Sequence, residues 1–270
     1  MSVHIKSEKR WMKAELHSHC NLDPIDYRIC QYTPEQLISN AARLGYEVLA
    51  ITCHDLNIWT EELADYAESL GITLIPGMEV TAERTFHMLV YNFRAEAEEL
   101  NTFKKIRALS SEDTLVIAPH AFFPGATCLK ELLETNLDLF DAIEYSGFQV
   151  RGLDFNRRSE LLAAKFQKPL IGSGDVHHLW QLGRTFTWVY SEPGVQPILS
   201  AVKQGFVKLQ KSPLTWFEAA GWWVNALWRN VVPANPAPQG LVPGVSIPAR
   251  ASNEVEDGRC FGPAKESMEP

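Results

Sequence analysis

The sequence predicts a single α/β domain in which parallel strands, joined by helices, form a barrel-like core. Short β-branched and apolar runs alternate with amphipathic stretches of helical length over residues 12–205, which is typical of strands connected by crossover helices. Seven of the eight histidines also fall at or just beyond an expected strand. Active-site residues occupy such positions in a parallel barrel.

The expected elements follow one another in a regular order. The first strand covers residues 12–16. Thr33 is then an N-cap, Pro34 a residue of the first helical turn and Glu35 an early acid, so a helix begins here and ends near Gly45. Next come a strand over 47–51, a helix over 60–70 and a strand over 72–75. Further strands are expected at 86–91, 115–118, 142–145, 169–171 and 187–190, and further helices at about 95–109, 128–136, 154–167 and 195–205.

Three segments are expected along the chain: an α/β domain over 1–211, a Trp-rich helix over 212–232 and a tail over 233–270. Residues 213–232 contain four tryptophans, and their only charges are Glu218 and Arg229. Because apolar residues cover nearly the whole helical circumference, we expect this helix to pack on the domain or on a partner rather than on a membrane. The tail is rich in Pro, Ala and Gly without periodicity, so we expect it to be disordered.

Composition and charge narrow the class of protein. Hydrophobic residues make up 46% and charged residues 21% of the chain, which excludes a disordered protein and favours a soluble globular enzyme. The formal charge of −8 argues against attraction of duplex nucleic acid or an anionic membrane. Five cysteines without a CxxC pair, and a start without a signal-peptide-like apolar segment, predict a reduced, cytoplasmic protein.

Two short motifs place possible metal ligands at opposite ends of the domain. His17 and His19 follow the first strand, and residues at i and i+2 of an extended chain share a face. Asp175 and His177 repeat this spacing after a turn that contains Gly172. Each pair alone fits a hydrogen-bonded pair about as well as a metal site.

The other strand ends favour the metal site. Glu79 is a lone carboxylate just past an expected strand, and its two oxygens can bridge two cations. His120 follows Pro119, which fixes the direction in which the chain leaves its strand. Six separate strand ends carry His, Asp or Glu. These are more ionisable side chains than a protein core can bury without cations to pair with them. The pattern therefore predicts a multinuclear metal site.

The motifs HSH, ITCHD, PGMEV, FHMLV, APH and GSGDVHH, in this order, resemble those of the PHP superfamily, named for its polymerase and histidinol phosphatase members. The resemblance runs from about Lys13 to Tyr190, and DAIEYSGF also looks like family sequence. It implies a stand-alone, metal-dependent phosphoesterase with a distorted (βα)7, TIM-like barrel. It also implies up to three divalent metal ions, commonly Zn, Mn or Fe.

The resemblance assigns ligands residue by residue. Ligands of the first metal would be His17, His19, Glu79 and Asp175. Glu79 would bridge to a second metal, completed by His87 and His120. The third would be held by His54 and His177 with an aspartate from the loop after HSH, where the spacing departs from the family and Asp23 is favoured over Asp26. Cys53 stands where the family usually has Asp, and we interpret it as a structural thiol.

The reaction is expected to use a hydroxide held by the metals, because the sequence has neither a GxSxG elbow nor a P-loop. Arg184 is the candidate phosphate contact, with an ordinary surface arginine as the alternative. Only seven residues separate Glu79 from His87, and thirty-two separate His87 from His120. An inserted lid domain has no room there, so the site should be open.

Nucleotide phosphates or the 5′ ends of short oligonucleotides are the expected substrates, for a 5′-3′ exonuclease-like or nucleotide phosphatase activity. A histidinol-phosphate-type phosphatase is the alternative. A non-catalytic or polymerase-associated module is the second alternative.

Overall fold

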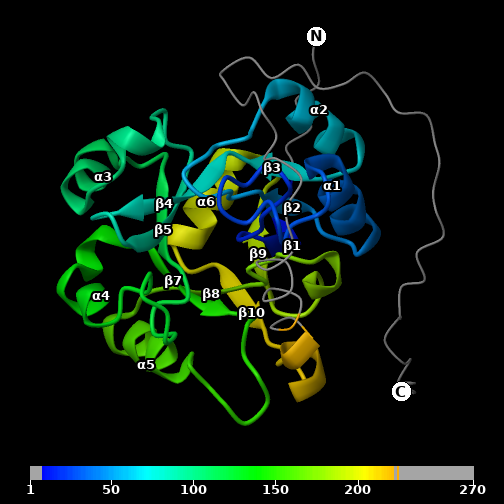
Figure 1. Ribbon diagram of the computed structural model, residues 1–270. Coiled ribbons are helices and arrows are strands. Elements are labelled where there is room, and N and C mark those ends of the chain that lie inside the picture. Colours follow the sequence, from blue (N-terminus) through cyan, green and yellow to red (C-terminus); the bar gives the residue numbers. More distant parts are fainter. Residues whose placement is uncertain (1–7, 222–223, 225–270) are drawn as a thin grey trace. The chain divides into compact units, whose positions relative to one another are not determined.

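The first of two five-stranded sheets has the strand order β10-β9-β1-β2-β3 (Figure 1). The computed structural model describes residues 8–221 and residue 224. Strands β1, β2 and β3 run parallel to one another, whereas β9 runs antiparallel to both β1 and β10. The bounds in this sheet are β1 (Arg10–Glu15), β2 (Val48–Ala50), β3 (Thr73–Ile75), β9 (Phe186–Ser191) and β10 (Val207–Gln210).

The second sheet has the order β4-β5-β6-β7-β8. Strand β5 is antiparallel to both neighbours, and β6, β7 and β8 are parallel. Residues at the start of β5 therefore lie at the same edge as the carboxyl ends of the parallel strands. The bounds are β4 (Gly77–Ala82), β5 (Phe86–Tyr91), β6 (Leu115–Ala118), β7 (Ala142–Ser146) and β8 (Leu170–Ser173).

Helices flank both sheets. In Figure 1, α1 and α2 lie beside the β1–β3 strands, and α3, α4 and α5 lie beside the second sheet. The start of α1 is as expected: Thr33 Oγ1 accepts from Gln36 N, and the Gln36 side chain accepts from Thr33 N. The α-helices are α1 (Pro34–Arg43), α2 (Glu61–Ser69), α3 (Phe103–Leu109), α4 (Glu131–Thr135), α5 (Arg157–Phe166) and α6 (Val195–Lys203). Short 3₁₀ helices are η1 (Ala97–Glu99), η2 (Leu137–Leu139) and η3 (Leu179–Gln181).

One apolar cluster joins the two sheets. Met12 and Leu16 from the first sheet region pack in the same cluster as Leu89 and Tyr91 of β5. The Tyr91 ring is fully buried, and its hydroxyl donates to Leu16 O over 2.6 Å. This shared core fixes the end of β1 relative to β5, and with it the residues that follow β1.

The predicted mixed α/β class is confirmed, but the structure differs from the local expectations in two places. Not all strands are parallel, since β5 and β9 run against their neighbours. Glu79 does follow the strand expected at 72–75, which is β3, but it lies within a further strand that was not expected, β4, where it pairs with Leu89.

The C-terminal helix begins at Trp216 and is described to residue 221 and at Val224. Thr215 and Glu218 form its capping box. Ala219 is buried, while the Trp216 and Phe217 side chains are exposed. The rest of the expected helix over 212–232 and the expected tail over 233–270 lie outside the described residues. Within the described residues, no helix is long and apolar enough to cross a membrane.

Candidate metal centre

Side chains from both sheets converge at one edge of the strands. Four groups of possible ligand atoms lie within 4.8 Å of one another in each group. The groups are His17, Glu79 and His120; His17, His19 and Asp175; His19, Asp23 and His54; and His54, Glu79 and His87. Residues that are more than a hundred positions apart in the chain therefore meet in one cluster, as the sequence predicts.

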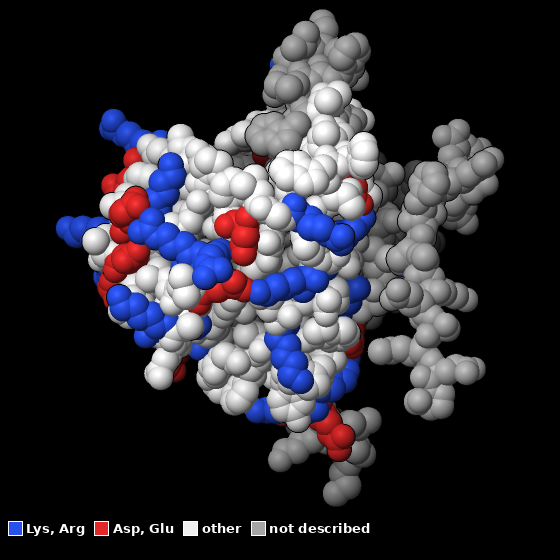
Figure 2. All heavy atoms as spheres, turned by 90° about the horizontal axis from the view of Figure 1, so that it is seen from below, with Lys and Arg blue, Asp and Glu red and all other residues white. Residues whose placement is uncertain are grey.

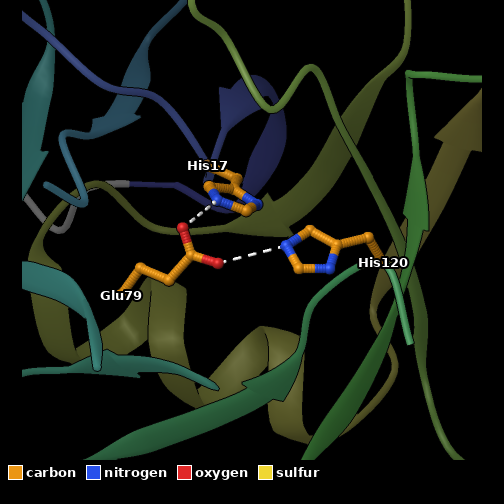
Figure 3. Close-up of side chains that lie close together, drawn as sticks. All are labelled: His17, Glu79 and His120. Carbon is orange, nitrogen blue, oxygen red and sulfur yellow. Dashed lines mark hydrogen bonds and ion pairs between the residues drawn. The ribbon is translucent and has the colours of Figure 1, made fainter. Parts of the chain in front are cut away.

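Glu79 lies at the centre of this cluster, buried in β4. Figure 3 shows one carboxylate oxygen directed to His17 and the other to His120. Five imidazole nitrogens surround the two oxygens: Oε1 is 2.8 Å from His87 Nδ1 and 3.1 Å from His120 Nε2, and Oε2 is 3.0 Å from His17 Nε2, 3.3 Å from His54 Nε2 and 3.4 Å from His19 Nε2. Burial alone would raise the pKa of Glu79, but the surrounding histidines hold it well below its ordinary value.

Asp175 forms the second anionic centre. It follows β8 with a positive φ of 45°, after Gly174, and its Oδ1 lies 3.5 Å from His17 Nε2 and 3.4 Å from His19 Nε2. Burial opposes ionisation, yet His17 and His177 lower the pKa of Asp175 well below its ordinary value. Glu79 and Asp175 thus present ionised oxygens to the same two histidines.

His17 and His19 turn the same ring nitrogen toward these oxygens. His17 Nδ1 lies 3.2 Å from Glu144 Oε2, and His19 Nδ1 lies 2.8 Å from Asp23 Oδ2. In both rings Nε2 is therefore the atom that faces Glu79 and Asp175. Carboxylates that hold the far nitrogen of a histidine in this way fix the orientation of a metal-binding ring.

Two aspartates meet His54 and His177 at one end of the cluster. Asp26 Oδ2 lies 3.0 Å from His177 Nε2 and 3.6 Å from His54 Nδ1. Asp23 Oδ2 lies 3.0 Å from His54 Nδ1. Asp23 is buried and also accepts from three backbone N–H groups, those of Ile25, Asp26 and His54. Asp23 therefore organises the loop, while the Asp26 carboxylate is partly exposed and faces two histidines.

Sequence reasoning missed two buried glutamates behind the cluster. Glu15 ends β1 and accepts from His17 N and Gly174 N, and burial raises its pKa to about 8. Glu144 lies in β7 and accepts from His120 N and from Ser173 Oγ. The available signal was a lone acid inside an expected apolar strand, over 12–16 for Glu15 and over 142–145 for Glu144.

Two sequence candidates lie beside the cluster. The buried Cys53 thiol lies 3.5 Å from Cys20 Sγ, and burial raises its pKa well above the ordinary value. Arg184 forms an ion pair with Glu218 at the start of the C-terminal helix. Its guanidinium is thus engaged by a carboxylate, and the expected phosphate contact stays a prediction.

The donor atoms fit divalent metal ions. His19 Nε2 is buried without a hydrogen-bond partner among the described residues, although carboxylate oxygens of Glu79 and Asp175 both lie 3.4 Å away. A nitrogen left unpaired between two ionised oxygens is expected where all three atoms point at a cation. The fold and this site define a mixed α/β protein with a histidine–carboxylate cluster suited to divalent metals.

Comparison with known proteins agrees with the mixed α/β fold. The fold resembles PsfC from Pseudomonas syringae PB-5123, with a TM-score of 0.52 and 17% identity over 82% of this chain and 98% of that chain. It also resembles the lesion-specific endonuclease PfuEndoQ from Pyrococcus furiosus, with a TM-score of 0.50 and 16% identity over 74% of this chain and 58% of that chain. At these identities the likeness concerns the fold alone.

A family model described as PHP-associated matches residues 154–207, which contain α5, β8, Asp175, His177 and β9. No curated protein matches the sequence. The match covers the region of the GSGDVHH motif, one of the ordered motifs that carry the resemblance described above. This match, together with the ordered motifs, supports an assignment to the PHP superfamily.

Proposed function

We propose that the protein is a hydrolase that uses divalent metal ions to cleave phosphate esters. The observation that carries this proposal is the position of Glu79, whose two oxygens face imidazoles on opposite sides. A bridging carboxylate of this kind holds two cations close together. Bound metals would polarise a phosphoryl oxygen and lower the pKa of water.

We propose three metal positions, each built from neighbouring donor groups. The first would use His17, His19, Glu79 and Asp175, and the second Glu79, His87 and His120. The third would use His54, His177 and Asp26, because the Asp26 carboxylate faces both of these imidazoles. Asp23 also faces His54, but it accepts from three backbone N–H groups as well, so we assign it a supporting role. His and carboxylate donors suit Zn, Mn and Fe alike.

The described strands also support the distorted (βα)7 barrel as part of this proposal. Thr187 of β9 accepts from Gly172 N over 2.7 Å and donates to Gly172 O over 2.8 Å. This side chain links β8, the edge strand of the second sheet, to β9 of the first sheet. On this basis the two sheets close around the core that Leu16 and Tyr91 share.

Nucleotide phosphates or oligonucleotide 5′ ends are the proposed substrates. Basic and acidic side chains are interspersed on the face in Figure 2, so this face does not offer the continuous basic surface that a long duplex would call for. The doubly cationic histidinol group would call for a dense acidic rim. Asp26 and Asp175, the partly exposed carboxylates of the cluster, already face histidines.

The test is a substrate panel after reconstitution with zinc or manganese. It compares initial rates on 5′-phosphorylated dinucleotides, adenosine bisphosphates, histidinol phosphate and a phosphodiester without a terminal phosphate. We expect the nucleotide phosphomonoesters to give the highest kcat/KM. A histidinol phosphate value tenfold above every nucleotide, a gap of about 1.4 kcal/mol, would reverse the ranking. Inactivity on all substrates with metals bound would favour the non-catalytic module.

A further inference from the structure

A groove with a volume of 410 Å³ lies between the loop before α1 and the η3 turn. The residues that give it its chemical character are Gln31, Tyr32, Gln36, Asn40, His178 and Trp180. Among the described residues, its lining contains no Asp, Glu, Lys or Arg side chain. The groove therefore offers amides and aromatic rings, without a fixed charge to bind a phosphate or a cation.

Both walls of this groove are connected through the backbone to residues of the metal centre. On one wall, His178 is the neighbour in sequence of His177, whose Nε2 lies 3.0 Å from Asp26 Oδ2. On the other wall, Ile29 N donates to Asp26 O over 2.8 Å. The two walls are tied together by the Tyr32 hydroxyl, which donates to Val176 O over 2.9 Å. These backbone links place the groove close to Asp26 and His177 along the chain.

The η3 wall is a preformed aromatic platform. The rings of His178 and Trp180 stack, with centroids 6.2 Å apart and an interplanar angle of 14°. Gln181 Oε1 accepts from both His177 N and His178 N, over 2.9 and 2.8 Å, which fixes the turn that carries the rings. Trp180 is nevertheless 42% exposed, so part of its indole surface is available to another ring.

The opposite wall supplies hydrogen-bonding groups. Gln31 and Gln36 are exposed, and Asn40 is half-buried. The Gln36 amide oxygen accepts from Thr33 N, which leaves its NH₂ group as a donor. Amide side chains that face an aromatic platform match a planar heteroaromatic ring with donors and acceptors on its edge.

We infer that this groove binds the nucleobase of a nucleotide whose phosphate is held at the metal centre. The inference rests on the proposed phosphoesterase function and specifies its substrate class. The base stacks on Trp180, and its edge meets the amides of Gln31, Gln36 and Asn40. The groove therefore increases affinity for nucleotides over phosphate esters that have no base.

The test compares adenosine 5′-phosphate with ribose 5-phosphate, which has the same phosphate ester but no base. Wild type, Trp180→Ala, Trp180→Phe and the matched control Trp216→Ala are assayed as the metal-reconstituted full chain. Trp216 is an exposed tryptophan outside the groove lining. We expect Trp180→Ala to raise KM for adenosine 5′-phosphate roughly tenfold, as loss of one stacked base predicts, with kcat and the ribose 5-phosphate values little changed. Trp180→Phe should keep most of the affinity.

Equilibrium binding of adenosine 5′-phosphate, measured by calorimetry, separates this inference from the proposed function. If wild type hydrolyses neither ester but Trp180→Ala weakens nucleotide binding roughly tenfold, the groove is supported and the function fails. If wild type hydrolyses both esters equally well and Trp180→Ala leaves both KM values unchanged, the function stands and the groove assignment is overturned. Equal weakening by Trp216→Ala would also overturn it.

Discussion

Replacing Glu144 with Gln should weaken metal binding although Glu144 lies behind the proposed ligands. Three donors converge on its carboxylate: His17 Nδ1 and His120 N each lie 3.2 Å from Oε2, and Ser173 Oγ lies 2.5 Å from Oε1. Gln keeps the shape but exchanges one oxygen for an NH₂ group, which is a donor. In one orientation the amide NH₂ group would meet two donors, His17 Nδ1 and His120 N, and in the other it would lie beside the Ser173 hydroxyl.

The structure indicates how large the effect should be. The Ser173 hydroxyl can rotate and accept, so the amide should place its NH₂ group beside Ser173 and keep its oxygen near His17. The His17 ring then keeps a neutral acceptor but loses a charged one, and charge-assisted hydrogen bonds are roughly twice as strong as neutral ones. Replacing an outer partner of a metal-binding histidine lowers metal affinity about 10–100-fold. We expect the lower end of this range, about tenfold, or about 1.4 kcal/mol.

The assay is a competition titration of zinc between a chromophoric chelator and the metal-free protein. Glu112→Gln, at an exposed residue, makes the same chemical change away from the site and should leave affinity unchanged. Thermal unfolding of the metal-free variants checks that both remain folded. A zinc affinity of Glu144→Gln within about threefold of wild type, a difference of less than about 0.7 kcal/mol, would refute the orienting role.

Three further predictions concern the metal ligands and their protons. Glu79→Gln should abolish most metal content and turnover while the circular dichroism spectrum is retained, because the bridging charge is lost; full occupancy with wild-type rates would contradict this. Metal binding should release protons and become tighter as pH rises from 6 to 9. Burial lowers the pKa of His19, but Asp175 and Asp23 raise it to about 10. The His19 ring is therefore protonated in the metal-free protein, and a metal ion must displace that proton to bind. Calorimetry in two buffers of different ionisation enthalpy measures this release, and equal heats would contradict it. Asp26→Asn should lower the metal stoichiometry by one ion with little loss of stability, whereas Asp23→Asn should destabilise the metal-free protein, as metal analysis and thermal unfolding can check.

Strand positions were predictable where apolar runs are short and end abruptly. The strands expected at 86–91 and 115–118 have these same bounds in the structure, as β5 and β6. Strand β4 was not predicted. It joins β5 through a tight turn in which Glu83 and Arg84 both have positive φ, 51° and 64°.

The composition of this turn explains the omission. Such turns are usually recognised by Asn-Gly or Asp-Gly, and neither occurs here. Contacts from elsewhere hold the strained turn instead: Glu83 N donates to Asn101 O, and Phe103 N donates to Glu83 Oε1. Because these partners come from another part of the chain, local sequence could not indicate the turn.

The histidines were predictable because each follows or begins a strand, and strand ends meet at one edge of a fold. The choice between Asp23 and Asp26 was not. It depends on the loop conformation, in which Asp23 Oδ1 accepts from Ile25 N at 2.8 Å and from Asp26 N at 2.7 Å. Both aspartates have plausible spacing in sequence, and both face histidines. Asp23 faces His19 and His54, and Asp26 faces His54 and His177. Only the folded loop shows that Asp23 also accepts from backbone N–H groups, so the assignment of the third ligand stays a prediction.

The carboxylates of the metal centre and the histidines around them explain how this cluster can fold before a metal ion binds. Burial disfavours protonated histidines, yet Asp175 and Glu79 raise the pKa of His17 well above its ordinary value. The Cys128 thiol and Glu79 do the same for the pKa of His120. A histidine whose pKa is raised in the folded state contributes stability that is complete below its unfolded pKa, near 6.5, and is lost as pH rises through the folded value. At neutral pH, protons therefore neutralise the carboxylates that metals neutralise in the loaded protein. Metal removal should then leave the strands and the core intact, and the metal-free cluster should become a source of instability only in alkaline solution.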